Sequence, residues 1–178
     1  NYAFSGCTGL SSITIPDSVT TLESSAFSYC EGLTEIILPK SVTTINNWAF
    51  EGCIGLTEVT IPSGVTILDG GVFQDCSNLE SVTLPEGLTE IGTYAFYGCS
   101  SLKEIAIPNG VREIGMYAFY DCRSLTEIVL PDYLQIIPMN TFEKCLQLNK
   151  IVLPKGLCVV EEYAFTDCKQ LATVYHKG

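Results

Sequence analysis

The chain has 178 residues, of which 47% are hydrophobic, and it carries a net charge of −11. No stretch approaches 18 consecutive apolar residues, so the sequence predicts no membrane-spanning helix and no membrane insertion. Residues 1–100 hold eleven acidic side chains against one basic side chain. Such a surface repels nucleic-acid phosphates and anionic lipid headgroups, although acidity also serves solubility alone. We therefore expect neither nucleic acid nor a membrane as partner.

A 23-residue period runs through the whole chain. All eight phenylalanines keep it, as do eight of the nine cysteines and seven of the eight prolines. A fixed period in this range indicates a solenoid, in which each unit contacts only its neighbours. We therefore expect residues 1–178 to form one array of seven full repeats and a partial one. The phenylalanines are Phe4, Phe27, Phe50, Phe73, Phe96, Phe119, Phe142 and Phe165.

The two ends of the sequence differ from the repeats between them. The chain opens at Asn1 in the middle of a repeat, and a solenoid needs a polar cap at each end. We therefore expect a fragment of a longer chain. His176 occupies a position where the other repeats place an inward Ile or Leu, which predicts that the array finishes near this end.

The first element of each repeat is a short strand, as in residues 35–38 of the unit that starts at residue 30. Alternation places Ile36 and Leu38 inward, and Glu35 and Ile37 outward. Pro39 then ends the strand, because proline has no N–H for a ladder. We expect these strands to share hydrogen bonds between neighbouring repeats.

The second half of the repeat follows the proline turn. Val42 and Ile45 form a second inward pair before a polar turn. Ala49, Cys53 and Leu56 then follow at i, i+4 and i+7, the apolar stripe of a very short helix. The sequence therefore predicts an α/β solenoid with one strand and one short helical turn in each repeat.

The repeated frame Cys-x-x-Leu-x-x-Ile-x-Ile-Pro-x-x-Val-x-x-Ile-x-x-x-Ala-Phe resembles the 23-residue repeat of the BspA-like leucine-rich-repeat family. The resemblance covers the entire chain and implies a curved, right-handed solenoid. It places the parallel strands on the concave face and the helical turns on the convex face. It further implies a secreted or surface-exposed bacterial or protozoan protein with an adhesion role. Val72 in place of alanine and the unusual residues 137–141 depart from the pattern.

The cysteines favour buried thiols over metal ligands. Each repeat cysteine lies on the inward stripe, where Cys behaves as a small hydrophobe, and each is a full repeat away from the next. Zinc sites need tighter pairs. Disulfides between neighbouring repeats remain an alternative, since adjacent strands lie about 4.8 Å apart. Cys158 is off the repeat at an exposed position, and it is the one thiol expected to react with a labelling reagent.

No catalytic, metal or cofactor site is expected. His176 is the only histidine, which removes Ser–His–Asp and Cys–His mechanisms, and no glycine-rich phosphate loop is present. The spacing of Glu35 and Glu58 approaches that of a retaining glycosidase pair. An open sheet, however, has no walls to raise one carboxyl pKa and exclude water.

The outward strand positions form two columns on the concave face, which we predict to bind a protein partner. Glu35–Glu58 and Glu104–Glu127 are expected as like charges on adjacent strands, a destabilising arrangement. The alternative is a solvated surface. The predicted contact residues of the first column are Glu35, Glu58, Ser81, Glu104, Glu127 and Lys150. Those of the second are Ile37, Thr60, Thr83, Ala106, Val129, Val152 and Tyr175.

Two apolar features allow either a packing or a binding role. The second column turns apolar towards the C-terminus, which indicates an interaction site or plain β-propensity. A third column just before Ala-Phe holds exposed-type aromatics, which either anchor partners or pack over the turns. Its members are Tyr2, Trp48, Tyr94, Tyr117 and Tyr163, with Tyr97 and Tyr120 nearby.

Two functions follow from these features. The first is a non-catalytic protein-binding module of a secreted or cell-surface protein, whose partner is a host extracellular-matrix or cell-surface protein. The second is a structural spacer that presents neighbouring domains, favoured by the bland Ser/Thr-rich faces. Charge reversal at Glu104 and Glu127 separates them, because only the binding module loses an activity.

Overall fold

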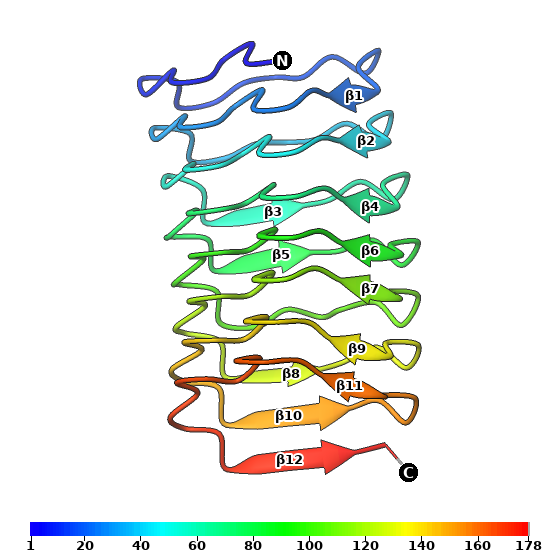
Figure 1. Ribbon diagram of the computed structural model, residues 1–178. Helices are drawn as coiled ribbons and strands as arrows, with labels where there is room; N and C mark the ends of the chain where they lie inside the picture. The colour runs from blue at the N-terminus through cyan, green and yellow to red at the C-terminus, as the bar shows by residue number, and fades with distance from the viewer. Residues whose placement is uncertain (178) are drawn as a thin grey trace.

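The computed structural model describes residues 1–177, and in it the chain winds as a stack of coils (Figure 1). Within residues 1–177, twelve short strands lie in two ladders on different sides of the stack. Every paired strand runs parallel to its neighbour. The solenoid predicted from the 23-residue period is therefore confirmed.

Ladder A is built from the strands that precede the repeated proline. Register pairing joins β3 to β5, and β8 to β10 to β12, while a single bridge joins Thr14 to Ile37. In β3 the middle residue, Val59, is buried between two exposed neighbours, as the alternation predicted. The strands are β3 (Glu58–Thr60), β5 (Ser81–Thr83), β8 (Glu127–Val129), β10 (Lys150–Leu153) and β12 (Thr173–His176).

Ladder B is built from the residues that follow the proline turn. Val42 and Ile45 are buried here, so the predicted second inward pair is confirmed, although the sequence did not show that a strand carries it. Its pairings are β1–β2, β4–β6–β7 and β9–β11. The strands are β1 (Thr21–Leu22), β2 (Thr44–Ile45), β4 (Ile67–Leu68), β6 (Glu90–Ile91), β7 (Glu113–Ile114), β9 (Ile136–Ile137) and β11 (Val159–Val160).

The prediction of short helical turns is wrong, since residues 1–177 contain no helix. The backbone instead takes positive φ two residues before and two residues after each phenylalanine. Around Phe50 these values are 57° at Trp48 and 65° at Gly52. A right-handed helix excludes that conformation, so the segment folds as irregular turns. The i, i+4, i+7 spacing marks burial on one side of these turns.

Backbone hydrogen bonds tie each turn to the following coil. The N–H groups of Trp48, Phe50 and Gly52 donate to carbonyls of the next coil along the chain, at 2.8–2.9 Å. Other coils repeat this pattern, as where Phe73 donates to Ala95 and Phe96 to Ala118. The turns therefore satisfy buried backbone donors without forming a helix or a regular strand.

The phenylalanines form one continuous stack through the core. Neighbouring ring centroids lie 5.2–5.7 Å apart, with planes within 12° of each other. Offset stacking of this kind adds to the free energy of burying the rings. Phe50, Phe73, Phe96, Phe119 and Phe142 are fully buried.

The repeat cysteines lie beside this stack, and all nine cysteines are free. Cys30 through Cys145 of the repeat column are buried as predicted. Each of these thiols donates to the carbonyl of a phenylalanine 26 residues earlier, as in the 3.0 Å contact of Cys76 Sγ with Phe50 O. Burial raises the pKa of the Cys53 thiol to about 12. A small side chain with a weak donor therefore suits this position.

We expect the native protein to show two fast-reacting thiols. Cys158 is exposed as predicted, and Cys7 is exposed as well, which the sequence did not indicate. Half-buried Cys168 reacts more slowly because the reagent reaches it less easily. The six buried thiols react only after unfolding, because burial excludes the reagent and disfavours the nucleophilic thiolate. Mass spectrometry after timed N-ethylmaleimide labelling counts them. Rapid labelling of six or more thiols in the folded protein contradicts the burial.

The stack tolerates the unusual residues 137–141. Thr141 takes the place of alanine, is fully buried, and its hydroxyl donates to the carbonyl of Pro138 at 2.7 Å. Ladder B is interrupted here, because β9 pairs with β11 but not with β7. A gap of the same kind separates β2 from β4, and the phenylalanine stack continues past residues 137–141.

Candidate partner-binding face

Both predicted columns lie on the outward side of ladder A. Eleven of the thirteen predicted contact residues are exposed, while Lys150 and Val152 are half-buried. The register places Glu127 beside Lys150, and Val129 beside Val152. Parallel strands therefore align side chains one repeat apart in rows along the stack.

The like-charge pairs predicted at Glu35–Glu58 and Glu104–Glu127 stay predictions, because regular strand pairing within the described chain does not join these residues. Glu127 forms an ion pair with Lys150, at 3.0 Å between Oε2 and Nζ. An exposed pair of this kind contributes about 0–1 kcal/mol. Lys150 thus neutralises the charge of Glu127 in the acidic column. The 23-residue spacing of these two residues predicts this ion pair.

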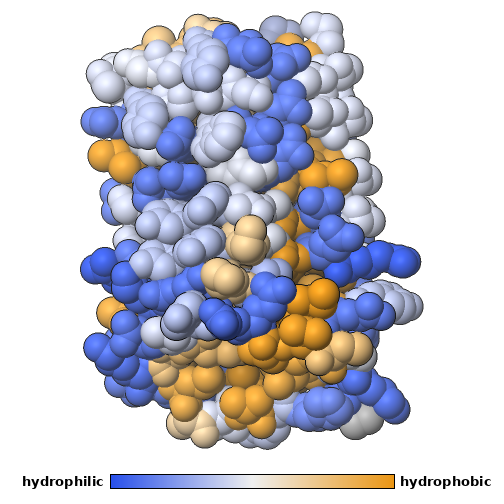
Figure 2. All heavy atoms as spheres, viewed as in Figure 1, coloured by the Kyte–Doolittle hydropathy of each residue, from blue (hydrophilic) through white to orange (hydrophobic). Residues whose placement is uncertain are grey.

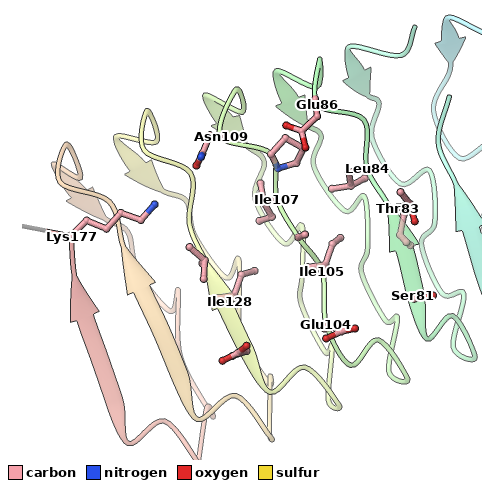
Figure 3. Close-up of a pocket in the computed structure, with 15 residues that line it drawn as sticks. Ser81, Thr83, Leu84, Glu86, Glu104, Ile105, Ile107, Asn109, Ile128 and Lys177 are labelled. Carbon is pink, nitrogen blue, oxygen red and sulfur yellow. The ribbon is translucent and has the colours of Figure 1, made fainter. Parts of the chain in front are cut away.

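Ladder A is interrupted at residues 104–107, which lie between β5 and β8 without belonging to a strand. A groove of about 800 Å³ lies over this segment (Figure 3). Glu104 and Ser81 line one part of it, and Ile107 and Asn109 line another. The groove is therefore polar and acidic along one edge and apolar along its floor.

Lys177 is a groove residue that the sequence did not indicate. Its backbone N–H donates to Leu153 O, and its ammonium reaches Leu130 O at 3.3 Å and Asp132 Oδ1 at 2.5 Å. Figure 3 shows its side chain extending from the end of β12 towards Asn109. These side-chain contacts have no local sequence signal, because the partners lie about two repeats apart in the chain.

A second groove of about 690 Å³ continues the same face towards the N-terminus. It lies over residues 35–38, β3 and β5, and shares Ser81 and Thr83 with the first groove. Ile37 is 79% exposed at its margin. The two grooves together place ten of the thirteen predicted contact residues along one extended recess, whereas Lys150, Val152 and Tyr175 line neither groove.

The C-terminal half of this face is apolar, as the second column predicted. Figure 2 shows hydrophobic residues gathered over β8, β10 and β12, below a more hydrophilic upper half. Val129 and Tyr175 are 47% and 52% exposed. Contiguous exposed apolar surface commonly marks an interaction site.

Ladder B carries a like-charge pair that the sequence analysis did not identify. Glu90 and Glu113 are directly opposed in the β6–β7 register. Burial and then Glu113 and Asp69 raise the pKa of Glu90. The folded state thus binds this proton more tightly than the unfolded state. The free energy of unfolding therefore falls as the pH rises from the pKa of Glu90 in the unfolded state to its higher pKa in the folded state.

We expect Glu90→Gln to raise the free energy of unfolding at pH 7 by about 0.5 kcal/mol, because it removes the opposed charge. The gain disappears at pH 3, where both carboxyls are protonated in either state. Urea unfolding at the two pH values measures it. Glu58→Gln is the control, since Glu58 lies opposite Ser81. An equal gain at both pH values rules out the charge explanation.

The aromatic column lies on the turns that follow ladder B. Tyr94 stacks on Tyr117 with centroids 5.1 Å apart, and Tyr97 stacks on Tyr120 at 4.8 Å. Trp48 is 42% exposed. The aromatic side chains of this column are therefore both packed on one another and exposed to solvent. The stacked rings lie one repeat apart, so the 23-residue period predicts which of them are neighbours.

In residues 1–177 no group of three or more His, Cys, Asp and Glu side chains is arranged to hold a metal ion. The same part of the chain has no helix long and apolar enough to cross a membrane.

Solved structures of bacterial leucine-rich-repeat proteins share this fold. A leucine-rich repeat protein of T. pallidum has 30% sequence identity and a TM-score of 0.87, with coverage of 90% of this chain and 78% of that chain. For a leucine-rich repeat protein of Bacteroides ovatus the values are 29% and 0.76, with coverage of 99% and 52%. The chain thus spans about half the length of the latter protein.

A leucine-rich cell surface protein of Faecalibacterium prausnitzii is 25% identical with a TM-score of 0.50, over 99% of this chain and 75% of that one. A search of curated proteins found no match. The BspA-type leucine-rich-repeat region matches residues 1–122 and 89–177, with six copies. The match extends over the described coils from end to end. The chain therefore belongs to the BspA-type leucine-rich-repeat family.

Proposed function

We propose that the chain is a non-catalytic protein-binding module of a secreted or cell-surface protein, and that ladder A is its binding face. The observation that carries the proposal is the extended recess over ladder A, with exposed side chains from successive coils along its length. Leucine-rich repeats generally serve protein–protein interaction, and one similar structure is a cell surface protein.

The chemistry of the face defines the partner. Glu35, Glu58 and Glu104 form no ion pair within residues 1–177, so the N-terminal part attracts basic side chains. Val129 and Tyr175 present apolar area in the C-terminal part. A partner that fits both parts has a basic segment beside an apolar one, as a host matrix or cell-surface protein with a mixed surface does.

Binding to a panel of extracellular-matrix and cell-surface proteins at 50 and 300 mM salt tests the proposal. We expect saturable binding to at least one protein, weakened at the higher salt because the acidic half is exposed to solvent. The folded state is verified by circular dichroism in the same buffers. If the folded protein binds no member of the panel, the binding module is contradicted and the spacer is favoured.

A further inference from the structure

A notch of about 530 Å³ lies on the turns that follow ladder B, separate from the ladder A face. Trp48 borders it on one side, and the tyrosine pairs border it on the other. Between them the coil of residues 70–75 presents small or polar side chains. Gly71 occupies the aromatic position of this coil, and the Trp48 ring lies against it, since a Cβ there would overlap Trp48 Cδ1.

One end of the tyrosine stack already holds a cation. The ammonium of Lys144 lies 4.8 Å from the centroid of the Tyr120 ring, and Tyr120 stacks with Tyr97 at 4.8 Å and an angle of 4°. Lys144 therefore covers the outer end of the pair. In the coil before Tyr97 the equivalent position holds Gln74, a neutral side chain that lines the notch together with Tyr97, so no cation of residues 1–177 covers this end of the pair.

Asp75 also lines the notch and supplies negative charge there. Its carboxylate leans over the next coil, since a Cβ on Gly98 would overlap Asp75 Oδ1. Among residues 1–177 no Lys or Arg forms an ion pair with Asp75, whose side chain contacts the Gln74 amide at 3.5 Å. Burial and then Tyr120 and Asp75 raise the pKa of Tyr97, so the charge of Asp75 acts on this ring.

The aromatic side chains at these positions stand on left-handed backbone, as does the equivalent residue of every repeat. Trp48, Tyr94 and Tyr117 have φ values of 57°, 61° and 58°. Left-handed backbone costs a side-chain-bearing residue about 1–2 kcal/mol, a cost that glycine avoids. Gly71 adopts the same conformation at the equivalent position, so the fold accepts glycine there. The aromatics stand at these positions against their backbone preference.

We propose that the notch binds an arginine side chain of a protein partner, with its guanidinium stacked on Tyr97 and hydrogen-bonded to Asp75. A guanidinium is planar, stacks on aromatic rings and bonds a carboxylate through two N–H groups, which an ammonium does not. No Lys or Arg of residues 1–177 forms an ion pair with Asp75, so a partner provides the cation. This site extends recognition beyond ladder A and does not rest on it.

Trp48 makes the test direct, because it is the only tryptophan of the chain and it borders the notch. The probe is a capped seven-residue peptide with arginine alternating with glycine, compared with the same peptide carrying neutral citrulline. We expect a saturable change in Trp48 fluorescence with the arginine peptide and at least tenfold weaker binding of the citrulline peptide. Equal binding of the two peptides overturns the proposal.

Asp75→Asn locates the effect, with Asp121→Asn as its matched control. Asp121 occupies the same repeat position two coils later, but Arg123 already holds its carboxylate at 2.8 and 2.9 Å. We expect at least fivefold weaker arginine-peptide binding for Asp75→Asn and no change for Asp121→Asn. Equal losses in the two variants reduce the effect to net charge and overturn the site. A Glu35/Glu58/Glu104→Lys variant on ladder A, which keeps the notch residues, separates this result from the proposed function.

Discussion

Phe96→Ala is expected to lower the free energy of unfolding by about 3–5 kcal/mol, the range for a fully buried phenylalanine. Phe96 is completely buried and stacks between Phe73 at 5.7 Å and Phe119 at 5.3 Å. Its removal leaves a cavity that neighbouring coils share. Because the Phe96 ring stacks on the rings of both neighbouring coils, the substitution weakens two coil interfaces at the centre of the array.

Urea unfolding followed by far-UV circular dichroism and by Trp48 fluorescence measures this effect. Phe4→Ala is the matched control, because Phe4 is 39% exposed and stacks on a single ring, that of Phe27. We expect a loss below about 2 kcal/mol for the control, because folding buries less of the apolar area of Phe4 than of Phe96. A loss below about 1 kcal/mol for Phe96→Ala contradicts the stack as the main support of the core.

Gly115→Ala gives the second large effect, about 2–3 kcal/mol of destabilisation from overpacking. A Cβ at Gly115 lies 2.6 Å from the Cα of Thr93 in the preceding coil, and it also overlaps the backbone N of that residue. Both atoms belong to the backbone, so no side-chain rotation relieves the contact. The two coils must move apart, which strains the hydrogen bond from Gly115 N to Ile91 O, now 2.7 Å long.

Gly87→Ala is the control for the loss of glycine itself. Its Cβ has one neighbour within 4 Å, the carbonyl oxygen of Ser63 at 3.8 Å, and its φ lies outside the left-handed region. We expect a change within about 1 kcal/mol, in the stabilising direction because alanine restricts the unfolded chain. Equal shifts of the melting temperature in the two variants would contradict the explanation that close contact between coils requires glycine at position 115.

The alternation and the repeated proline predicted ladder A correctly, down to the burial of Val59 between Glu58 and Thr60. The helical turns were predicted wrongly for a physical reason. Gly52 and Gly98 are residues typical of positive φ, but Trp48 and Tyr94 adopt it without any such signature. An apolar spacing of i, i+4 and i+7 then fits a helix and a buried turn equally well.

The candidate face was predictable to the extent that it follows the repeat. Side chains one repeat apart become neighbours, which determines the columns and the Glu127–Lys150 ion pair. The interruption of ladder A at residues 104–107 has no such signal, because Glu104 and Ala106 fit the strand pattern as well as the residues of β5. The position of Lys177 also depends on coils that are distant in the sequence.

The most direct test of ladder A as the binding face compares two charge reversals of equal size on the strongest partner from the surface panel. Glu35/Glu58/Glu104→Lys changes ladder A, and Glu23/Glu113/Glu162→Lys changes exposed residues outside its outward columns. Surface plasmon resonance at 50 mM salt gives both dissociation constants. We predict at least tenfold weaker binding for the ladder A variant and less than threefold for the other. Equal weakening in the two variants, with both proteins folded, contradicts ladder A as the recognition surface.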